Sequence, residues 1–462
     1  MRKIETHHPR VPWSWVTWMT LPWVSFIYAE NISNAGPLAF TLRKFIENPA
    51  LIGFLGSLNV AFNFIVGAFT SYMSDRIWTR WGRRRPFLIV GWMGVALALI
   101  LVPLAPNAWV LMGIIVFYQF CADIAKPIEP LMNEVIPASQ RGRAATIRNV
   151  AQNLIVMFFF GVMLAQFDRV YDLEAFGASI KINGEMTLYW TGSFLLLLAV
   201  AFLAFRVQET PPPHTIRRER FNPKLFLRDI FGQRQWLTVY LLYAAPMVAS
   251  PGLNVFEPLM RTEQFGFSKA EFAWVVSVGL IVNICIYVPL AGYLADHVSR
   301  LRLMQAGILA QTIATFTFFL YLRYVADYAI SITTLLAFGL GTGLFSTCVH
   351  ICWGPLIYDY IPTERFGTVS AGLAVVSGIV PFFMINLAGL WVTGFTKLFG
   401  TRGGSNYDYS SIYFLQLVGA AAALALTLYV GREEKAGRLV PYGRTELRTG
   451  KPASSSYPHG GG

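Results

Sequence analysis

The stretch SYMSDRIWTRWGRRRPF, residues Ser71 to Phe87, lies between two long apolar segments and holds one acid, Asp75, and five arginines. A charged side chain in the middle of a bilayer costs a few kcal/mol or more. The stretch is therefore expected to form a short loop between two membrane-spanning helices. Its positive charge predicts that this loop lies on the cytoplasmic side, which sets the expected orientation of the whole chain.

The composition predicts an integral membrane protein. The chain has 462 residues, of which 55% are hydrophobic and 13% are charged, whereas a soluble domain carries about 25% charged residues. The net charge of +12 does not indicate a nucleic-acid partner, because the basic residues fall in loops between apolar segments. The four cysteines lie inside apolar segments, and no disulfide framework or metal-binding spacing is visible. The N-terminus shows no cleavable signal peptide.

Spanning helices need roughly 20 apolar residues, and the sequence predicts twelve of them in two sets of six. The first set lies near 13–36, 50–73, 87–105, 108–133, 145–167 and 186–206, and the second near 236–259, 271–294, 302–322, 329–357, 368–395 and 410–430. The domain organisation that follows is an N-terminal bundle (1–206), a cytoplasmic linker (207–235), a C-terminal bundle (236–431) and a cytoplasmic tail (432–462). The predicted class is an all-α membrane protein.

The distribution of positive charge supports cytoplasmic termini at both ends. With both termini inside, 26 of the 37 lysines and arginines fall in cytoplasmic segments and 9 fall in outer loops. We expect a monomer in a bacterial inner (plasma) membrane, with the lipid bilayer as its surroundings.

The two halves repeat each other. The exit of the fourth span reads MNEVIPASQRGRAAT (Met132 to Thr146), and that of the tenth reads YDYIPTERFGTVSA (Tyr358 to Ala371). The loop after the eighth span, Gly292 to Arg302, repeats the acid and arginines of the loop after the second. Matching features six spans apart predict two bundles related by an axis along the membrane normal, with a binding site between them at the midplane.

These loops resemble the signature of the major facilitator superfamily, which is G-x-x-x-D followed by basic residues. Gly292 and Asp296 match it in the second half, and Ser71 stands in place of the glycine in the first half. The resemblance implies twelve helices in two pseudo-symmetric six-helix bundles that open alternately to the two sides of the membrane.

A narrower resemblance rests on the longer spacing from Asp75 to GRRRPF (Gly82 to Phe87) and on CAD at Cys121 to Asp123. These features are similar to those of the glycoside–pentoside–hexuronide cation symporters, and within them to the sucrose–proton symporters. The chain departs from that pattern in carrying Lys126 and Glu129. The resemblance implies symport of a small sugar substrate, a disaccharide or related glycoside such as sucrose or maltose, with the proton as coupling ion and no other cofactor.

Ionisable residues inside a span are costly and usually face a water-filled cavity. The fourth span carries Asp123, Lys126 and Glu129 at a spacing of three, near one face of a helix. Arg148 on the fifth span lies at the height of Lys126 and Glu129 if both helices rise 1.5 Å per residue. These four residues are candidates for proton coupling, with Asp123 as the proton acceptor by resemblance and depth. A static ion-pair network that joins the two helices is the alternative.

Other polar residues in the spans are candidates for binding substrate hydroxyl groups, because amides and carboxylates can hydrogen-bond to them and a Trp ring can stack on a sugar. Solvation near the interface, or packing in the case of His350, is the alternative. The candidate substrate-binding residues are Glu30, Asn34, Gln119, Asp123, Arg148, Gln152, Asn254, Glu257, His350 and Trp353.

The charged loops at the cytoplasmic ends are candidates for a gate, because an acid there can pair with arginines and with the N-terminal dipole of a neighbouring helix. A purely topogenic role for the arginines is the alternative. The candidate gate residues are Asp75, Arg83, Arg84, Arg85, Asp296 and Arg300.

The sequence contains no nucleotide-binding motif, no metal-ligand spacing and no nucleophile–base pair, so no enzyme activity is expected. Two other functions remain open. One is transport or efflux of a different polar solute, and the other is a non-transporting membrane assembly factor of the same fold. The titratable residues within the spans argue against the second.

Overall fold

The computed structural model describes residues 12–34, 36–74, 78–136, 140–175, 178–207, 209, 228, 230–361, 366–401 and 403–439. Within these residues, ten helices are long and apolar enough to cross a membrane, and Ala108–Ile124 is a shorter apolar helix. The first predicted span is divided among shorter helices, so all twelve predicted spans have a helical counterpart.

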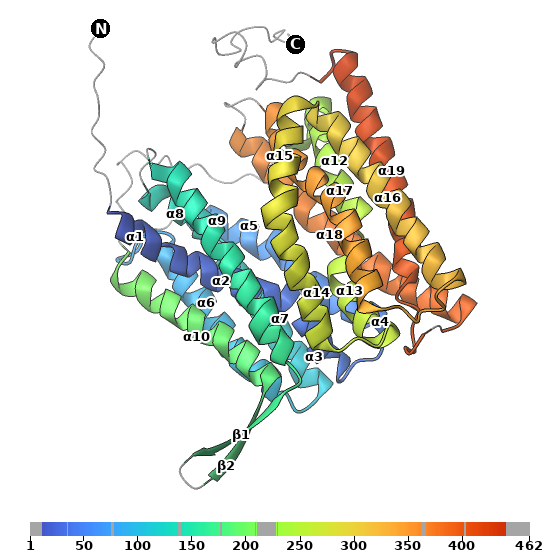
Figure 1. Cartoon of the computed structure of the whole chain (residues 1–462). Helices are drawn as coiled ribbons and strands as arrows, with labels where there is room; N and C mark the ends of the chain where they lie inside the picture. Colours follow the sequence, from blue (N-terminus) through green and yellow to red (C-terminus); the bar gives the residue numbers. More distant parts are fainter. Residues whose placement is uncertain are drawn as a thin grey trace, which may run out of the picture. The chain divides into compact units, whose positions relative to one another are not determined.

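The first half supplies six of these spans, and Figure 1 labels their helices. In chain order they consist of α1 (Trp13–Trp18), α2 (Thr20–Asn34) and α3 (Pro37–Arg43); α4 (Pro49–Phe62), η1 (Asn63–Gly67) and α5 (Ala68–Ser74); α6 (Arg85–Leu101); α7 (Ala108–Ile124) and α8 (Ile128–Val135); α9 (Arg141–Phe158); and α10 (Gly184–Phe205).

The second half supplies the other six. They consist of α12 (Arg234–Ala249), α13 (Leu253–Leu259) and η6 (Met260–Gln264); α14 (Lys269–Val282), η7 (Asn283–Tyr287) and α15 (Val288–His297); α16 (Arg300–Tyr324); α17 (Ile332–Asp359); α18 (Phe366–Phe399); and α19 (Ser411–Lys435).

The first helix of each half is broken at a glycine with positive φ. Gly36 has φ +112° between α2 and α3, and Gly252 has φ +63° between α12 and α13. Residues with a Cβ rarely adopt these angles, so glycine allows the chain to turn there. The two breaks occupy matching positions in the repeat, which is a structural sign of the internal symmetry.

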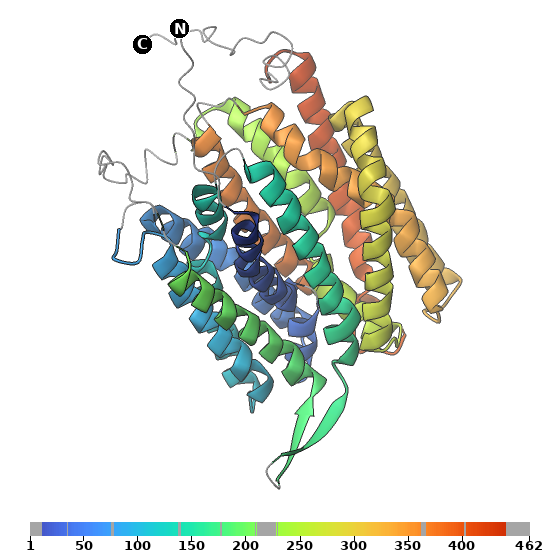
Figure 2. The same cartoon turned by 60° about the vertical axis from the view of Figure 1, so that its left-hand side comes forward.

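An antiparallel hairpin that the sequence pattern did not predict separates α9 from α10. It consists of β1 (Val170–Ala175) and β2 (Ala178–Asn183), with Val170 opposite Asn183. Figure 2 shows the hairpin extending beyond the ends of the helices.

The chain divides into two compact units. Unit 1 comprises the described residues within Met1–Glu219, Gly252–Val278 and Val392–Tyr409, and unit 2 comprises those within Arg220–Pro251, Gly279–Trp391 and Ser410–Gly462. Unit 1 therefore contains the first half together with α13, η6, most of α14 and the end of α18 from the second half. The predicted domain boundaries at 206 and 236 stay a prediction.

Close helix packing depends on small residues in both units. In unit 1, a Cβ on Gly91 of α6 would lie 2.7 Å from the carbonyl oxygen of Cys121 on α7. In unit 2, a Cβ on Gly419 of α19 would lie 2.1 Å from the carbonyl oxygen of Val248 on α12. Such contacts are typical of helix packing in membranes.

We call one end of unit 1 the hairpin end. It carries Arg43, the strands β1 and β2, and Glu263. The arginine end lies at the opposite end of α10 and carries Arg83 to Arg85 and Glu209.

Candidate functional site

A buried ion pair lies in the interior of unit 1, where α7 ends. Asp123 is fully buried, and neither of its carboxylate oxygens has a hydrogen-bond partner among the described residues. Lys126 Nζ lies 3.4 Å from Asp123 Oδ1. The helix stops at Ile124, and α8 begins only after Pro127, so Lys126 lies in the short break between two helices. A buried carboxylate is tolerated when a cation balances it, so Lys126 accounts for the charge of Asp123.

Polar side chains from α2, α4 and α7 line a pocket beside this pair. The pocket has an empty volume of about 390 Å³, which includes open solvent. Apolar side chains, among them Phe26, Trp92 and Tyr118, make up much of its wall. Its polar lining residues are Glu30, Ser33, Asn59, Gln119 and Lys126. Three predicted site residues, Glu30, Gln119 and Lys126, therefore share one pocket.

Hydrogen bonds fix several of these side chains. Gln119 Nε2 donates to Ser33 Oγ at 2.8 Å, which leaves Gln119 Oε1 buried without a partner. Asn59 Nδ2 donates to Asn34 Oδ1 at 3.3 Å. The carboxyl, amide and hydroxyl groups in and around this pocket can both donate to and accept from the hydroxyl groups of a polar solute.

The side chain of Arg148 lies against an aromatic ring of α2. Its guanidinium lies 4.4 Å from the centre of the Trp23 ring on α2. It forms no ion pair with any carboxylate whose side chain the structure describes. Trp23 Nε1 in turn donates to Gln152 Oε1 at 2.9 Å. Residue spacing gives the height of Arg148 along α9 but not the side it faces. The side chain of Glu129, on α8, lies outside the described part.

The second-half candidates are divided between the units. In unit 1, Asn254 lines a small pocket that Ser33 and Gly36 also line, and Glu257 forms an ion pair with Arg261 one turn later.

In unit 2, Trp353 stacks on Tyr243, with ring centres 4.8 Å apart, and donates to the Tyr243 carbonyl oxygen at 3.1 Å. This packing occupies one face of the indole that was predicted to stack on a sugar. His350 Nδ1 lies 2.8 Å from the Ser346 carbonyl oxygen, and His350 lines a separate pocket with Gln416.

The arginine end uses an acid that the sequence reasoning missed. The Glu209 carboxylate accepts hydrogen bonds from the backbone N–H groups of Arg83, Arg84 and Arg85 at 2.8, 3.1 and 2.8 Å. These groups lie at the N-terminus of α6, where a helix binds anions well. Asp75, the predicted partner of these arginines, lies outside the described residues. Glu209 could have been noticed in the sequence as an acid that follows α10, at the start of the polar linker.

Arg300, a candidate gate residue, pairs with an acid that the sequence reasoning did not single out. Arg300 Nη1 lies 3.0 Å from Asp359 Oδ2, at the end of α17, and Asp296 is exposed. Packing of α16 against α17 brings Asp359 to the start of α16. Asp359 belongs to the repeated YDYIP motif, so its repeat equivalent is Glu134, whose side chain is not described.

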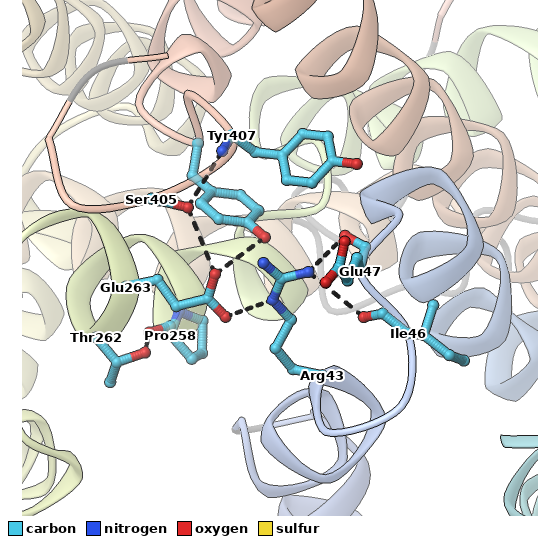
Figure 3. A network of polar contacts seen from close by, with 9 residues as sticks. Arg43, Ile46, Glu47, Pro258, Thr262, Glu263, Ser405 and Tyr407 are labelled. Atoms are coloured by element: carbon cyan, nitrogen blue, oxygen red, sulfur yellow. Dashed lines mark hydrogen bonds and ion pairs between the residues drawn. The ribbon is translucent and has the colours of Figure 1, made fainter. Parts of the chain in front are cut away.

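A second network that the sequence did not reveal lies at the hairpin end (Figure 3). Arg43 Nε lies 2.7 Å from Glu263 Oε1, and Arg43 Nη1 donates to the Glu47 carbonyl oxygen at 2.6 Å. Glu263 Oε2 also accepts from Ser405 at 3.4 Å and from Tyr409 at 3.5 Å. We call these residues the hairpin-end network. It links α3 of the first half to η6 and to the 403–409 segment of the second half.

Burial, together with the negative charge of Glu263, raises the pKa of the Tyr409 hydroxyl above its ordinary value. Tyr409 therefore stays protonated and can donate to Glu263. A second ion pair at the same end joins Lys269 of α14 to Asp168, with 2.5 Å between Nζ and Oδ1. The hairpin end of unit 1 is thus closed by charged contacts between segments far apart in the sequence.

Comparison with known proteins agrees with this architecture. A family model described as the Major Facilitator Superfamily matches residues 15–256 and 249–455. Comparison with curated proteins gives no match.

Three solved structures share the fold of the chain. A mutant of the nucleoside transporter NupG is 12% identical, with a TM-score of 0.63, over 90% of this chain and 99% of that one. A D-xylose–proton symporter is 14% identical, with a TM-score of 0.64, over 90% and 97% of the two chains. The POT family transporter PepTSo is 12% identical, with a TM-score of 0.66, over 93% and 99%. At these identities the likeness establishes the fold alone.

Proposed function

The chain belongs to the major facilitator superfamily, and we propose that it is a proton-coupled symporter of a disaccharide or related glycoside, such as sucrose or maltose. Membership makes it an integral membrane protein of the transporter fold and not an enzyme. The predicted twelve-helix fold is thereby confirmed. The substrate, the proton and the roles of individual residues are proposals.

The observation that carries the proposal is the buried Asp123–Lys126 pair beside a polar pocket in unit 1. When Asp123 takes up a proton, Lys126 loses its buried counter-charge and is free to contact a solute or another acid. A ligand that binds one protonation state better than the other shifts the equilibrium between conformations. In this way proton binding and solute binding can be coupled.

The sugar part of the proposal rests on the resemblance of Ser71 to Phe87 and of Asp123 to the sucrose–proton symporters. The amide, hydroxyl and carboxyl groups in the pocket suit the hydroxyl groups of a sugar, and aromatic rings such as Phe26 and Trp92 suit its apolar faces. The other substrate candidates, Asn254, Glu257, His350 and Trp353, keep their proposed role. No cofactor besides the proton is required.

For the gates, we place the arginine end in the cytoplasm together with both termini, and the hairpin end outside. The hairpin-end network then holds the outer end of unit 1 closed in this conformation. At the cytoplasmic end, Glu209 with the N-terminus of α6 and the Arg300–Asp359 pair are the contacts proposed to break and re-form during transport. We expect the protein to work as a monomer in a bacterial plasma membrane.

A second candidate is transport of a different polar solute. Lys126 and Arg148 favour it, because two cations inside one bundle suit a solute richer in acceptors than a neutral sugar, and Arg148 forms no ion pair with a carboxylate whose side chain is described. A non-transporting assembly factor is less favoured, because such a protein has no use for a titratable pair in its interior.

The test is uptake of radiolabelled sucrose and maltose into proteoliposomes under an inward proton gradient, with and without a protonophore. Uptake that collapses with the protonophore supports the proposal. Failure to take up either sugar, in protein shown to be folded, refutes the disaccharide substrate.

Asp123→Asn tests the coupling residue in the same assay. We expect this variant to lose uphill accumulation and to retain part of the exchange activity. The matched control is Asp327→Asn, in the exposed turn after α16, where φ is +44° and asparagine is well tolerated. Accumulation by Asp123→Asn equal to that of the control removes Asp123 from the coupling mechanism.

A further inference from the structure

An apolar groove lies on the surface of unit 2 between α16 and α19, which lie side by side in Figure 1. Its empty volume is about 630 Å³, which includes open solvent. Leu309, Ile313 and Thr317 of α16 and Ala421 of α19 line the groove and are exposed. Both helices are candidate membrane spans, so these exposed side chains face the hydrocarbon of the bilayer.

The groove offers apolar surface and no free hydroxyl proton. The Thr312 hydroxyl donates to the carbonyl oxygen of Ile308 at 2.6 Å. The Thr317 hydroxyl donates to the carbonyl oxygen of Ile313 at 2.8 Å. The other residues that line the groove are apolar. A polar group buried without a hydrogen-bond partner is costly, so the groove suits a hydrocarbon chain better than a polar solute.

Three basic side chains lie at one end of the two helices. The start of α16 packs against the end of α19, because a Cβ on Gly431 would lie 3.5 Å from Leu301 Cδ2. Arg302 and Arg432 directly follow these two residues, so they lie at similar heights. Lys435 lies about one turn beyond Arg432. All three basic side chains are exposed, so this end presents a positive charge to its surroundings.

The three cations lie on the same faces of the two helices as the groove. Arg302 precedes Leu309 by seven residues. Arg432 and Lys435 follow Ala421 by eleven and fourteen residues. At about 3.6 residues per turn, these intervals are close to two, three and four whole turns. Side chains separated by whole turns share one face of a helix, so the charges continue the line of the groove.

The distance from the charges to the far end of the groove matches the thickness of one leaflet. Fifteen residues separate Arg302 from Thr317, which corresponds to about 22 Å along the helix. Half of a bilayer, with its headgroups, is about 20–22 Å thick. A phospholipid whose phosphate lies beside the charges therefore reaches the far end of the groove with its acyl chain.

We propose that this groove binds an anionic phospholipid of the cytoplasmic leaflet, with an acyl chain in the groove and the phosphate beside Arg302, Arg432 and Lys435. Basic pockets between spanning helices on the cytoplasmic side attract anionic headgroups. The leaflet follows from the orientation proposed above, in which the Arg300–Asp359 pair at the same end of α16 is cytoplasmic. The lipid is a bound partner, distinct from the transported solute.

The competing occupant is a helix from a second copy of the chain. Small residues such as Ala420 and Ala421 allow helices to approach closely in a membrane. A symmetric pair that met at this groove, however, would place both sets of cations at one height in the membrane. Like charges brought together oppose such a contact, so the charge at the end of the groove favours the lipid.

The test compares dioleoylphosphatidylglycerol with dioleoylphosphatidylcholine, which share their chains and their phosphate but differ in net charge. Each lipid is titrated into the delipidated full-length protein in detergent, and native mass spectrometry measures the bound lipid. We expect the wild type to bind phosphatidylglycerol at least about tenfold more tightly, because each basic residue near an anionic lipid contributes about fivefold. Equal binding of the two lipids overturns the inference.

Charge variants test the three cations. Arg432→Gln should weaken binding of phosphatidylglycerol about fivefold, and the triple variant Arg302→Gln/Arg432→Gln/Lys435→Gln should lose the preference for it. Lys397→Gln is the matched control, because Lys397 is an exposed cation of α18 that does not line the groove. The control should bind as the wild type does. An unchanged preference in the triple variant shows that the cations do not hold the headgroup and overturns the inference.

A groove variant tests the acyl chain. Ala421→Phe fills the groove without changing the charge, and Ala422→Phe places the same ring on the next exposed residue, which does not line the groove. We expect Ala421→Phe to bind phosphatidylglycerol at least about tenfold more weakly than Ala422→Phe, because the chain loses its apolar contacts. Equal binding by these two variants overturns the inference.

Two further outcomes separate the lipid from other occupants. If Ala421→Phe does not fold, the wild type is challenged with free glycerol phosphate, which has the anion and no chain. Retention of the bound lipid supports the inference, and its displacement overturns it. Dimers that carry no phosphatidylglycerol and that dissociate in Ala421→Phe assign the groove to a second copy and also overturn it.

Discussion

Breaking the Arg43–Glu263 ion pair should open the hairpin end of unit 1. The two side chains are 17% and 23% exposed, and Nε lies 2.7 Å from Oε1. A hydrogen bond between charged groups contributes about 1.5–3 kcal/mol when it is well formed, and partial exposure lowers this value toward about 1–2 kcal/mol. The bonds from Ser405 and Tyr409, at 3.4 and 3.5 Å, are too long to add much.

A change of about 1–2 kcal/mol shifts the ratio of closed to open molecules by about 5–30-fold. The shift can be measured as the rate at which a membrane-impermeant maleimide labels a cysteine introduced at Asn254. This residue lines a small pocket together with Ser33, Gly36 and Leu42, and Leu42 directly precedes Arg43 in α3. The native cysteines are replaced beforehand, since Cys285 is exposed.

We expect Glu263→Gln and Arg43→Gln each to speed labelling severalfold. The double variant should be labelled no faster than either single variant, because all three variants lose the same contact. Glu271→Gln is the matched control, because this half-buried acid at the start of α14 accepts hydrogen bonds from Ser268 and forms no ion pair among the described residues. Strictly additive effects of the two substitutions, or faster labelling in the control as well, would refute the reasoning.

Three further outcomes follow from the arginine end and from unit 2. Glu209→Gln should lower the melting temperature, because a carboxylate bound by three backbone N–H groups is replaced by a neutral amide at a cost of about 1–3 kcal/mol; an unchanged melting curve contradicts this. Gly82→Ala should destabilise the same site, since φ is +103° and the new Cβ would lie 2.7 Å from the Glu209 carboxyl carbon; normal thermal stability would disprove the assigned contact. Arg300→Gln and Asp359→Asn should slow transport to similar degrees, with no further loss in the double variant; an additive loss would mean that the pair does not act as a unit.

The sequence was sufficient for the spans and for their arrangement in two related halves. Whether a segment spans the membrane depends on the free energy of transferring about 20 consecutive side chains into lipid. That free energy is a sum over the residues of the segment. The repeat was visible in short motifs, and the structure adds the matching breaks at Gly36 and Gly252. The depth of Asp123 and Lys126 in the membrane, calculated from the rise per residue of a helix, stays a prediction.

The hairpin β1–β2 was missed because the residues between two predicted spans, 168–185, were treated as an outer loop. A single two-stranded hairpin is marginal in water on its own, so its formation depends on the helices α9 and α10 that hold its ends.

Only the tertiary structure decided which charges meet. Glu209 binds the start of α6, Asp359 pairs with Arg300, and Glu263 pairs with Arg43 across more than two hundred residues. Hydropathy and charge counts predict the spans and the side of the membrane on which each loop lies, because those quantities are sums along the chain. The direction in which a side chain points depends on the rotation and packing of its helix against neighbours that are distant in sequence, and Arg148, stacked on Trp23, is the clearest case.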